Sequence, residues 1–164
     1  MRSGLQEKMK TEKAYFGAGC FWHVEEAFRC VKGVVKTTVG YMGGKMKNPT
    51  YEDVCTDKTM HAETVEVEYD PTKIPYEKLL DVFWSVHDPT QLNRQGPDIG
   101  TQYRSTIFYC TKEQKEKALK SKEGAQKRFR QKIATEIIKA STFYRAEEYH
   151  QKYLQKRGLA SCNI

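Results

Sequence analysis

The pattern of hydrophobic and polar positions predicts a chain that mixes strands with helices. Residues 63–69 read E-T-V-E-V-E-Y, and this period of two is typical of a strand with one buried face. Residues 76–86 instead place Leu79, Phe83 and Val86 at helical spacing, which predicts an amphipathic helix. By the same reasoning we expect strands over 13–17, 33–39, 105–110 and 135–140, and helices over 20–29 and after Thr111.

The order of these elements favours the α+β class, because strands and helices do not alternate strictly along the chain. A length of 164 residues suits one domain with its own core. We therefore expect a single domain over 1–164, with a mixed sheet packed by helices. The sequence further predicts a flexible N-terminus over 1–13 and a mobile C-terminal tail over 151–164.

Composition and charge exclude some classes of protein. The longest apolar runs are far shorter than the roughly 18 residues needed to span a bilayer. The N-terminus lacks the apolar stretch of a secretion signal, and Glu7 and Glu12 are unlike an organelle presequence. We expect a cytoplasmic protein with access to the nucleus.

The formal net charge is +7, and residues 112–132 hold nine Lys or Arg against three Glu. We interpret this segment as the solvated face of a helix. A nucleic-acid-binding module is the alternative, and it would bind in a salt-sensitive manner.

Five cysteines are present, and no two of them form a C-x-x-C pair. An odd number without a secretion signal argues against a disulfide framework, so we expect Cys30, Cys55 and Cys110 to be structural thiols. Cys20 differs because it begins a predicted helix after glycines. The helix end would stabilise a thiolate there, although a lone cysteine is also commonly a small buried residue.

The residues around Cys20 are recognisable. Gly19-Cys20-Phe21-Trp22, followed by Glu25, closely resembles the G-C-F-W motif of the peptide methionine sulfoxide reductase A family. The resemblance continues in the family's order through G-Y-M-G-G (40–44), N-P-T-Y (48–51), H-A-E (61–63), F-W (83–84), H-D-P-T-Q (87–91), G-T-Q-Y-R-S (100–105), T-E-I (135–137), F-Y-R-A-E (143–147) and Y-H-Q (149–151). It implies a two-layer sandwich with the catalytic cysteine at the N-terminus of the first helix.

The resemblance also implies a reaction. Cys20 would attack the sulfur of methionine S-sulfoxide, free or in proteins, and Glu63 would protonate the oxygen. Tyr51 and Tyr103 would donate hydrogen bonds to that oxygen. A carboxyl group is an acid near neutral pH only when its pKa is raised, so we expect Glu63 in a partly apolar pocket, protonated before turnover.

Other residues follow from the same resemblance. Phe21 and Trp22 would form the apolar wall for the substrate methyl group, and Asp98 would support the substrate site. Cys162 would resolve the Cys20 sulfenic acid as a disulfide that thioredoxin reduces. No third cysteine of a longer relay follows Cys162, and no metal or bound organic cofactor is implied. We expect a monomer with no nucleic-acid or membrane partner.

Two departures from the family pattern are His23 and Met60, where glycine is common; neither removes a catalytic group. Two enzymatic alternatives remain. His61-Ala62-Glu63 fits the H-x-E of zinc deaminases, but the later P-C-x-x-C is missing. A cysteine hydrolase would pair Cys20 with a histidine and depend on it.

Overall fold

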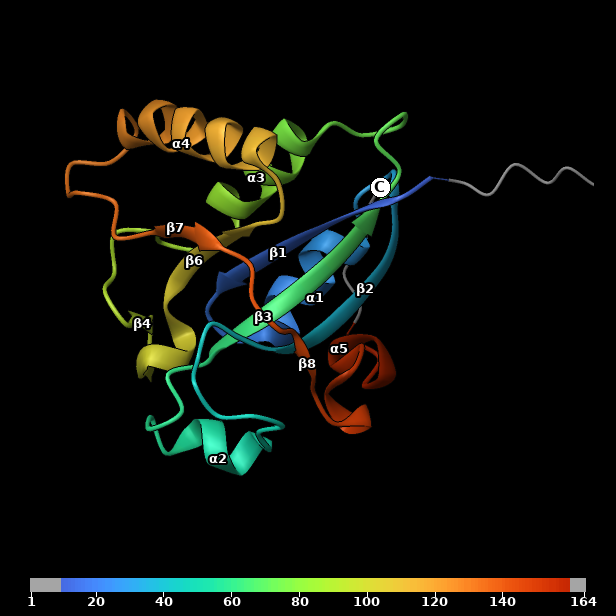
Figure 1. Cartoon of the computed structure of the whole chain (residues 1–164), viewed down its shortest axis with the longest axis vertical. Helices are drawn as coiled ribbons and strands as arrows, with labels where there is room; N and C mark the ends of the chain where they lie inside the picture. Colours follow the sequence, from blue (N-terminus) through green and yellow to red (C-terminus); the bar gives the residue numbers. More distant parts are fainter. Residues whose placement is uncertain (1–9, 160–164) are drawn as a thin grey trace, which may run out of the picture.

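The computed structural model describes residues 10–159, and a mixed sheet forms its centre (Figure 1). Six strands lie in the order β7-β6-β1-β3-β2-β8. All neighbours are antiparallel except β6 and β7, which run parallel. The strands are β1 (Glu12–Ala18), β2 (Val34–Met42), β3 (Ala62–Tyr69), β6 (Ser105–Tyr109), β7 (Glu136–Lys139) and β8 (Tyr144–Arg145).

Three helices cover one face of this sheet: α1 (Phe21–Arg29), α3 (Tyr76–Ser85) and α4 (Lys112–Gln126). Alternate residues of the central strands, such as Phe16 and Val65, point into the layer between sheet and helices and are fully buried. The helices contribute Phe28 and Leu79 to the same core. The expected α+β two-layer sandwich is therefore confirmed.

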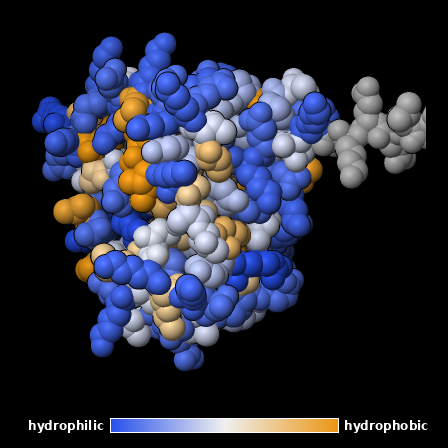
Figure 2. Space-filling view, viewed as in Figure 1, coloured by the Kyte–Doolittle hydropathy of each residue, from blue (hydrophilic) through white to orange (hydrophobic). Residues whose placement is uncertain are grey.

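The opposite face of the sheet is covered more thinly. Met42, Ala62 and Phe108 form a small buried cluster there, against which Tyr15 and Phe143 pack. Figure 2 shows a mostly hydrophilic surface on the side viewed, with hydrophobic side chains in small separate groups, one of them over β7. The main core therefore lies on the helical face.

Several short elements were missed by the sequence prediction. Outside the strands and helices that the sequence predicted, β2 continues to Met42, and a hairpin forms from β4 (Arg94–Gln95) and β5 (Asp98–Ile99). A 3-10 turn, η1 (Thr101–Tyr103), follows the hairpin, and helix α2 (Tyr51–Cys55) lies between β2 and β3. A capping box begins α2, in which Thr50 and Asp53 bond each other's backbone N–H groups.

The basic segment forms α4 as expected, with few buried residues and most lysines exposed. Lys117 pairs with Glu113 and Glu77 at its surface. Its character as a solvated helix is confirmed. Within residues 10–159, no helix is long and apolar enough to cross a membrane.

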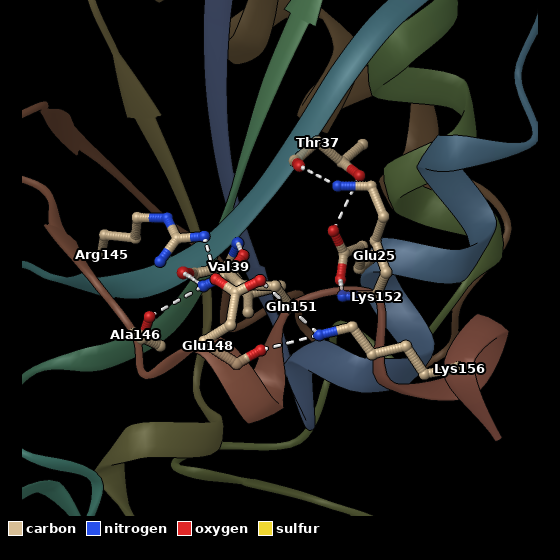
Figure 3. Close-up of polar contacts among 9 residues, drawn as sticks. All are labelled: Glu25, Thr37, Val39, Arg145, Ala146, Glu148, Gln151, Lys152 and Lys156. Atoms are coloured by element: carbon tan, nitrogen blue, oxygen red, sulfur yellow. Dashed lines mark hydrogen bonds and ion pairs between the residues drawn. The ribbon is translucent and has the colours of Figure 1, made fainter.

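The C-terminal segment corrects the prediction of a mobile tail from residue 151. It forms η2 (Glu148–His150) and α5 (Tyr153–Lys156), which packs on α1. Figure 3 shows how it is tied down: the Gln151 amide bonds both the N–H and the C=O of Val39, at 2.9 Å each. The Lys152 N–H donates to buried Glu25 at 2.7 Å, and Thr37 donates to the other oxygen of Glu25. At the other end, residues 12 and 13 belong to β1 and not to a flexible terminus.

We predict that Gln151→Met lowers the free energy of unfolding by about 1–3 kcal/mol, because it leaves the buried Val39 N–H and C=O without their side-chain partner. Urea unfolding measures the change. Gln155→Met, at an exposed position of α5, is the matched control and should stay within about 0.5 kcal/mol. Equal stabilities of the two variants would show that the anchor contributes nothing.

Candidate functional site

The ends of two neighbouring strands bring the central residues of the candidate site together. Cys20 follows β1 and is the N-cap residue of α1, while Glu63 lies near the start of the adjacent antiparallel β3. Gly19 joins strand to helix with a φ of +99°, and an added Cβ would lie 2.9 Å from the Gln95 side chain. Glu63 lies on the same face of β3 as Val65, toward the helices, and its bond to the Phe21 N–H places it under the first turn of α1.

Glu63 is a buried carboxyl held by both oxygens. Its side chain is only 2% exposed. Oε1 accepts the Phe21 N–H at 3.2 Å, and Oε2 accepts the Gln102 side-chain N–H at 2.7 Å. Burial raises the pKa of Glu63 to about 7, against the lowering effect of these two hydrogen bonds. Glu63 can thus gain or lose a proton near neutral pH, and its expected buried location is confirmed.

Cys20 behaves differently from the expectation of a stabilised thiolate. Burial first, and then the charge of Glu63, raise the pKa of Cys20 to about 12. The Trp22 and His23 N–H groups at the helix end do lower this pKa, as the sequence predicted, but they are outweighed. The resting residue is a neutral, half-buried thiol.

Two tyrosines lie beside the carboxyl. Burial raises the pKa of both Tyr51 and Tyr103, and the charge of Glu63 raises both further. Their hydroxyls therefore stay protonated as hydrogen-bond donors. The Tyr51 N–H donates to Glu147 at 2.9 Å, which fixes the start of α2 against the C-terminal segment. The charge of Asp98 acts on Cys20, Glu63 and Tyr103, which places it at the same site.

The aromatic residues after Cys20 form one side of the site. Phe21 is 1% exposed, and its ring lies 5.1 Å from that of His150. Trp22 is partly exposed; its indole N–H donates to His150 Nδ1 at 3.0 Å, and its ring stacks on Tyr153 with centroids 3.7 Å apart. The C-terminal segment thus supports the wall that Phe21 and Trp22 provide.

The sequence prediction gave no role to several residues that complete this arrangement. Gln102, Glu147 and His150 lie in motifs that we recognised, but only the structure shows what they contact. Cys162 lies outside the described residues. Cys55 and Cys110 are free thiols, whereas Cys30 is disulfide-bonded, so the expectation of a structural thiol was wrong for Cys30. The residues next to Cys30 in the sequence do not indicate a disulfide.

The alternative enzymes lose support from the histidines. His61 uses both ring nitrogens within the fold, with Gly44 N at 2.9 Å and Met46 O at 2.7 Å. His87 likewise bonds Phe83 O and Ser105 Oγ. In residues 10–159, no three His, Cys, Asp or Glu side chains are grouped to hold a metal ion, and no hydrogen bond joins the Cys20 thiol to a histidine ring.

The chemistry available is that of a thiol and a carboxyl that share protons. Below pH 7 both groups are protonated, and between about 7 and 12 the pair holds one proton. Transfer of that proton from Cys20 to Glu63 would create a thiolate and an acid together. Such a pair suits attack on an electrophilic atom whose leaving oxygen must be protonated, with two phenols as donors.

Comparison with known proteins agrees with this chemistry. Residues 12–164 match the family model described as "Peptide methionine sulfoxide reductase". The chain is 60% identical over 161 residues to "Peptide methionine sulfoxide reductase MsrA" of Geobacter metallireducens, covering 97% of this chain and 99% of the relative.

Solved structures give the same result. The crystal structure of Mxr1 from Saccharomyces cerevisiae in reduced form has a TM-score of 0.88 and 37% identity, covering 94% of this chain and 92% of that one. The structure of Mxr1 in complex with Trx2 has a TM-score of 0.63 and 27% identity, covering 91% of each chain.

We predict that Glu63→Gln makes Cys20 react faster with iodoacetamide at pH 8, because it removes the negative charge that raises the pKa of the thiol. Mass spectrometry of the Cys20 peptide follows the alkylation. Glu66→Gln is the control, since Glu66 lies on the other face of β3 and bonds Tyr15. In the wild type the rate of Cys20 alkylation should still be rising at about pH 10. A rate that reaches a plateau near pH 8 would contradict the raised pKa of Cys20.

Proposed function

The chain belongs to the peptide methionine sulfoxide reductase family, and from this premise we propose how its residues perform the reaction. The enzyme is an oxidoreductase that reduces methionine sulfoxide to methionine. We propose that it takes the S epimer, free or in proteins, since each sulfoxide epimer has its own reductase. The observation that carries the mechanism is a buried carboxyl with a pKa of about 7 beside the Cys20 thiol.

In the proposed reduction step, Glu63 acts twice on one proton. The ionised carboxylate first takes the proton of Cys20, and the thiolate attacks the sulfoxide sulfur. Glu63 then delivers the proton to the sulfoxide oxygen while Tyr51 and Tyr103 donate hydrogen bonds to it. The attack forms a bond between the Cys20 sulfur and the substrate sulfur. This bond and the S–O bond of the substrate then break as the protonated oxygen passes to the Cys20 sulfur, which leaves Cys20 as a sulfenic acid and releases methionine. The sulfur of methionine gains the two electrons that Cys20 loses.

The substrate side chain would lie against the aromatic wall. We propose that the partly exposed Trp22 offers an apolar surface to the methyl group, with the buried Phe21 behind it. The contacts of His150 and Tyr153 with Trp22 hold that surface in place. We propose that Asp98 supports the substrate from the hairpin side. Its charge reaches Cys20, Glu63 and Tyr103, which supports this assignment.

We propose that Cys162 resolves the sulfenic acid and that thioredoxin recycles the enzyme. The Cys162 thiol would condense with the Cys20 sulfenic acid, forming a disulfide and releasing water. A dithiol then reduces this disulfide by exchange. The yeast complex of Mxr1 with Trx2 supports a thioredoxin as reductant. The free thiols Cys20, Cys55 and Cys110 suit a reducing compartment, whereas the disulfide at Cys30 does not. We propose the cytoplasm, with access to the nucleus.

The test of this function follows methionine formation from the separated S and R sulfoxides. We expect turnover of the S epimer only, with dithiothreitol and with thioredoxin, thioredoxin reductase and NADPH. Cys20→Ser should abolish both, because no nucleophile remains. Cys162→Ser should form about one methionine per enzyme with thioredoxin and then stall, because the sulfenic acid is no longer resolved.

Three outcomes would contradict parts of this proposal. Turnover of the R epimer would reject the stereochemical assignment. Unimpaired thioredoxin cycling by Cys162→Ser would assign resolution to another thiol. A folded, reduced enzyme that turns over neither epimer would reject the function. Cys110→Ser is the control, since that free, exposed thiol lies on α4's side of the sheet and has no proposed role.

We predict that the single-turnover rate of methionine formation rises with pH through about 7, because Glu63 must be ionised to accept the Cys20 proton. Glu63→Gln should slow this step roughly 10²- to 10⁴-fold. In Glu63→Gln, the single-turnover rate should rise only at the higher pH at which Cys20 itself ionises. Rapid-quench kinetics at intervals of about half a pH unit, from about pH 5.5 to about pH 9, measure the wild-type rise, the slowing in Glu63→Gln and the loss of the rise near pH 7 in that variant. A wild-type rate that falls through pH 7 would instead favour a carboxyl protonated before turnover.

A further inference from the structure

Gln102 is a buried side chain in contact with the proton-transferring carboxyl. It is the middle residue of η1 and is only 4% exposed. Its side-chain nitrogen donates to Glu63 Oε2 at 2.7 Å and to Cys55 Sγ at 3.7 Å. The next residue, Tyr103, has its pKa raised by burial and then by the charge of Glu63. The proposed mechanism gives Gln102 no role.

We propose that Gln102 is a positioning residue that clamps the Glu63 carboxylate and keeps it ready to accept the Cys20 proton, with Cys55 fixing the orientation of the Gln102 amide. This inference rests on the proposed role of Glu63 as the group that exchanges a proton with Cys20.

The clamp has two parts. The Phe21 N–H holds Oε1 and the Gln102 side-chain N–H holds Oε2, so each carboxylate oxygen accepts one hydrogen bond from a rigid element. Both partners are donors, and donors favour the ionised carboxylate over the acid. Burial alone would push Glu63 toward the protonated form, in which it cannot take a proton from Cys20. The two hydrogen bonds lower the pKa of Glu63 and so oppose the effect of burial.

Cys55 determines which way the Gln102 amide points. An amide can present either NH₂ or oxygen to a neighbour, and an oxygen facing the carboxylate would repel it. With the nitrogen toward Glu63, the second N–H points to Cys55 Sγ, a weak acceptor. The Tyr51 hydroxyl also bonds Cys55. One thiol therefore links the clamp on the carboxyl to a proposed donor for the sulfoxide oxygen.

Other charged and titratable groups face Glu63 and bear on its protonation. They come from the N-cap of α1 and from β2, α2, β5 and η1, and they are Cys20, Tyr41, Tyr51, Asp98 and Tyr103. Burial and the charge of Asp98 raise the pKa of Glu63, whereas the hydrogen bonds from Phe21 and Gln102 lower it. Among the side chains that contact Glu63, Gln102 is thus the one whose hydrogen bond favours the carboxylate.

The test replaces Gln102 by methionine, which has a similar volume and no donor. The single-turnover rate of methionine formation rises with pH, and in this variant the midpoint of that rise should move up by about one pH unit or more. The reason is that the Glu63 carboxylate loses a hydrogen bond. At pH 7 the variant should be about fivefold slower or more, and raising the pH should restore its rate. Gln114→Met is the matched control, since Gln114 is also buried but bonds Lys13 and Cys110 far from the site.

A direct measurement separates this inference from the proposed function. The ¹³C chemical shift of the Glu63 carboxyl, assigned with Glu63→Gln, gives its titration in the free enzyme without any turnover. Gln102→Met should shift that titration upward, and Gln114→Met should not. A Gln102→Met enzyme that is slow at every pH, with an unshifted Glu63 titration, would overturn the proposal even if the wild type reduces sulfoxide as expected.

Cys55→Ala provides a second variant in case Gln102→Met fails to fold. It leaves Gln102 in place and removes the acceptor of its second N–H. We expect an upward shift of the Glu63 titration smaller than that of Gln102→Met. Cys110→Ala, which removes the other exposed free thiol, is the control and should leave the titration unchanged. Identical titrations in the two cysteine variants would overturn the role of Cys55.

Discussion

The arrangement of the site depends on one buried carboxyl. Glu63 faces the helical layer of the sandwich because side chains of β3 alternate between the two faces, and its position in the register puts it under the first turn of α1. Burying a carboxyl is costly unless its oxygens are hydrogen-bonded, which the Phe21 and Gln102 N–H groups achieve. Burial raises the pKa of Glu63 more than these hydrogen bonds lower it, so its pKa is about 7 and it can gain or lose a proton near neutral pH.

The C-terminal segment completes the site from the other side of α1. Buried hydrogen bonds of Gln151 and Glu25 join it to β2 and to α1, far along the chain from both. This anchorage sets the positions of His150 and Tyr153, which hold the indole of Trp22 by a hydrogen bond and by stacking. The substrate wall is therefore made by the first helix but oriented by η2 and α5. The carboxyl and the wall meet at Phe21, whose ring belongs to the wall and whose N–H donates to Glu63 Oε1.

Local patterns predicted the main strands and helices because their hydrophobic periods are strong and each buries one face. They missed α2, whose T-x-x-D capping box at Thr50 was present but not used, and the β4–β5 hairpin, which is too short for a period. For the site, the family resemblance supplied Cys20 and Glu63 together. The pKa of Cys20 could not follow from its place at a helix end, because burial and the Glu63 charge come from the tertiary fold. Likewise, nothing in the sequence around Gln102 indicates which carboxyl it contacts.

The same burial that raises the pKa of Glu63 also raises that of Cys20, and this coupling bears on selectivity. A neutral thiol is a poor nucleophile toward ordinary electrophiles and oxidants, which react with thiolate. In the proposed mechanism the thiolate forms only as its proton moves to Glu63, and that state is useful only if an oxygen is present to receive the proton. A sulfoxide has both an electrophilic sulfur and a basic oxygen, whereas an alkylating agent has no such oxygen. Sharing one proton between Cys20 and Glu63 therefore favours reaction with the substrate over the side reactions that a permanently ionised cysteine would invite.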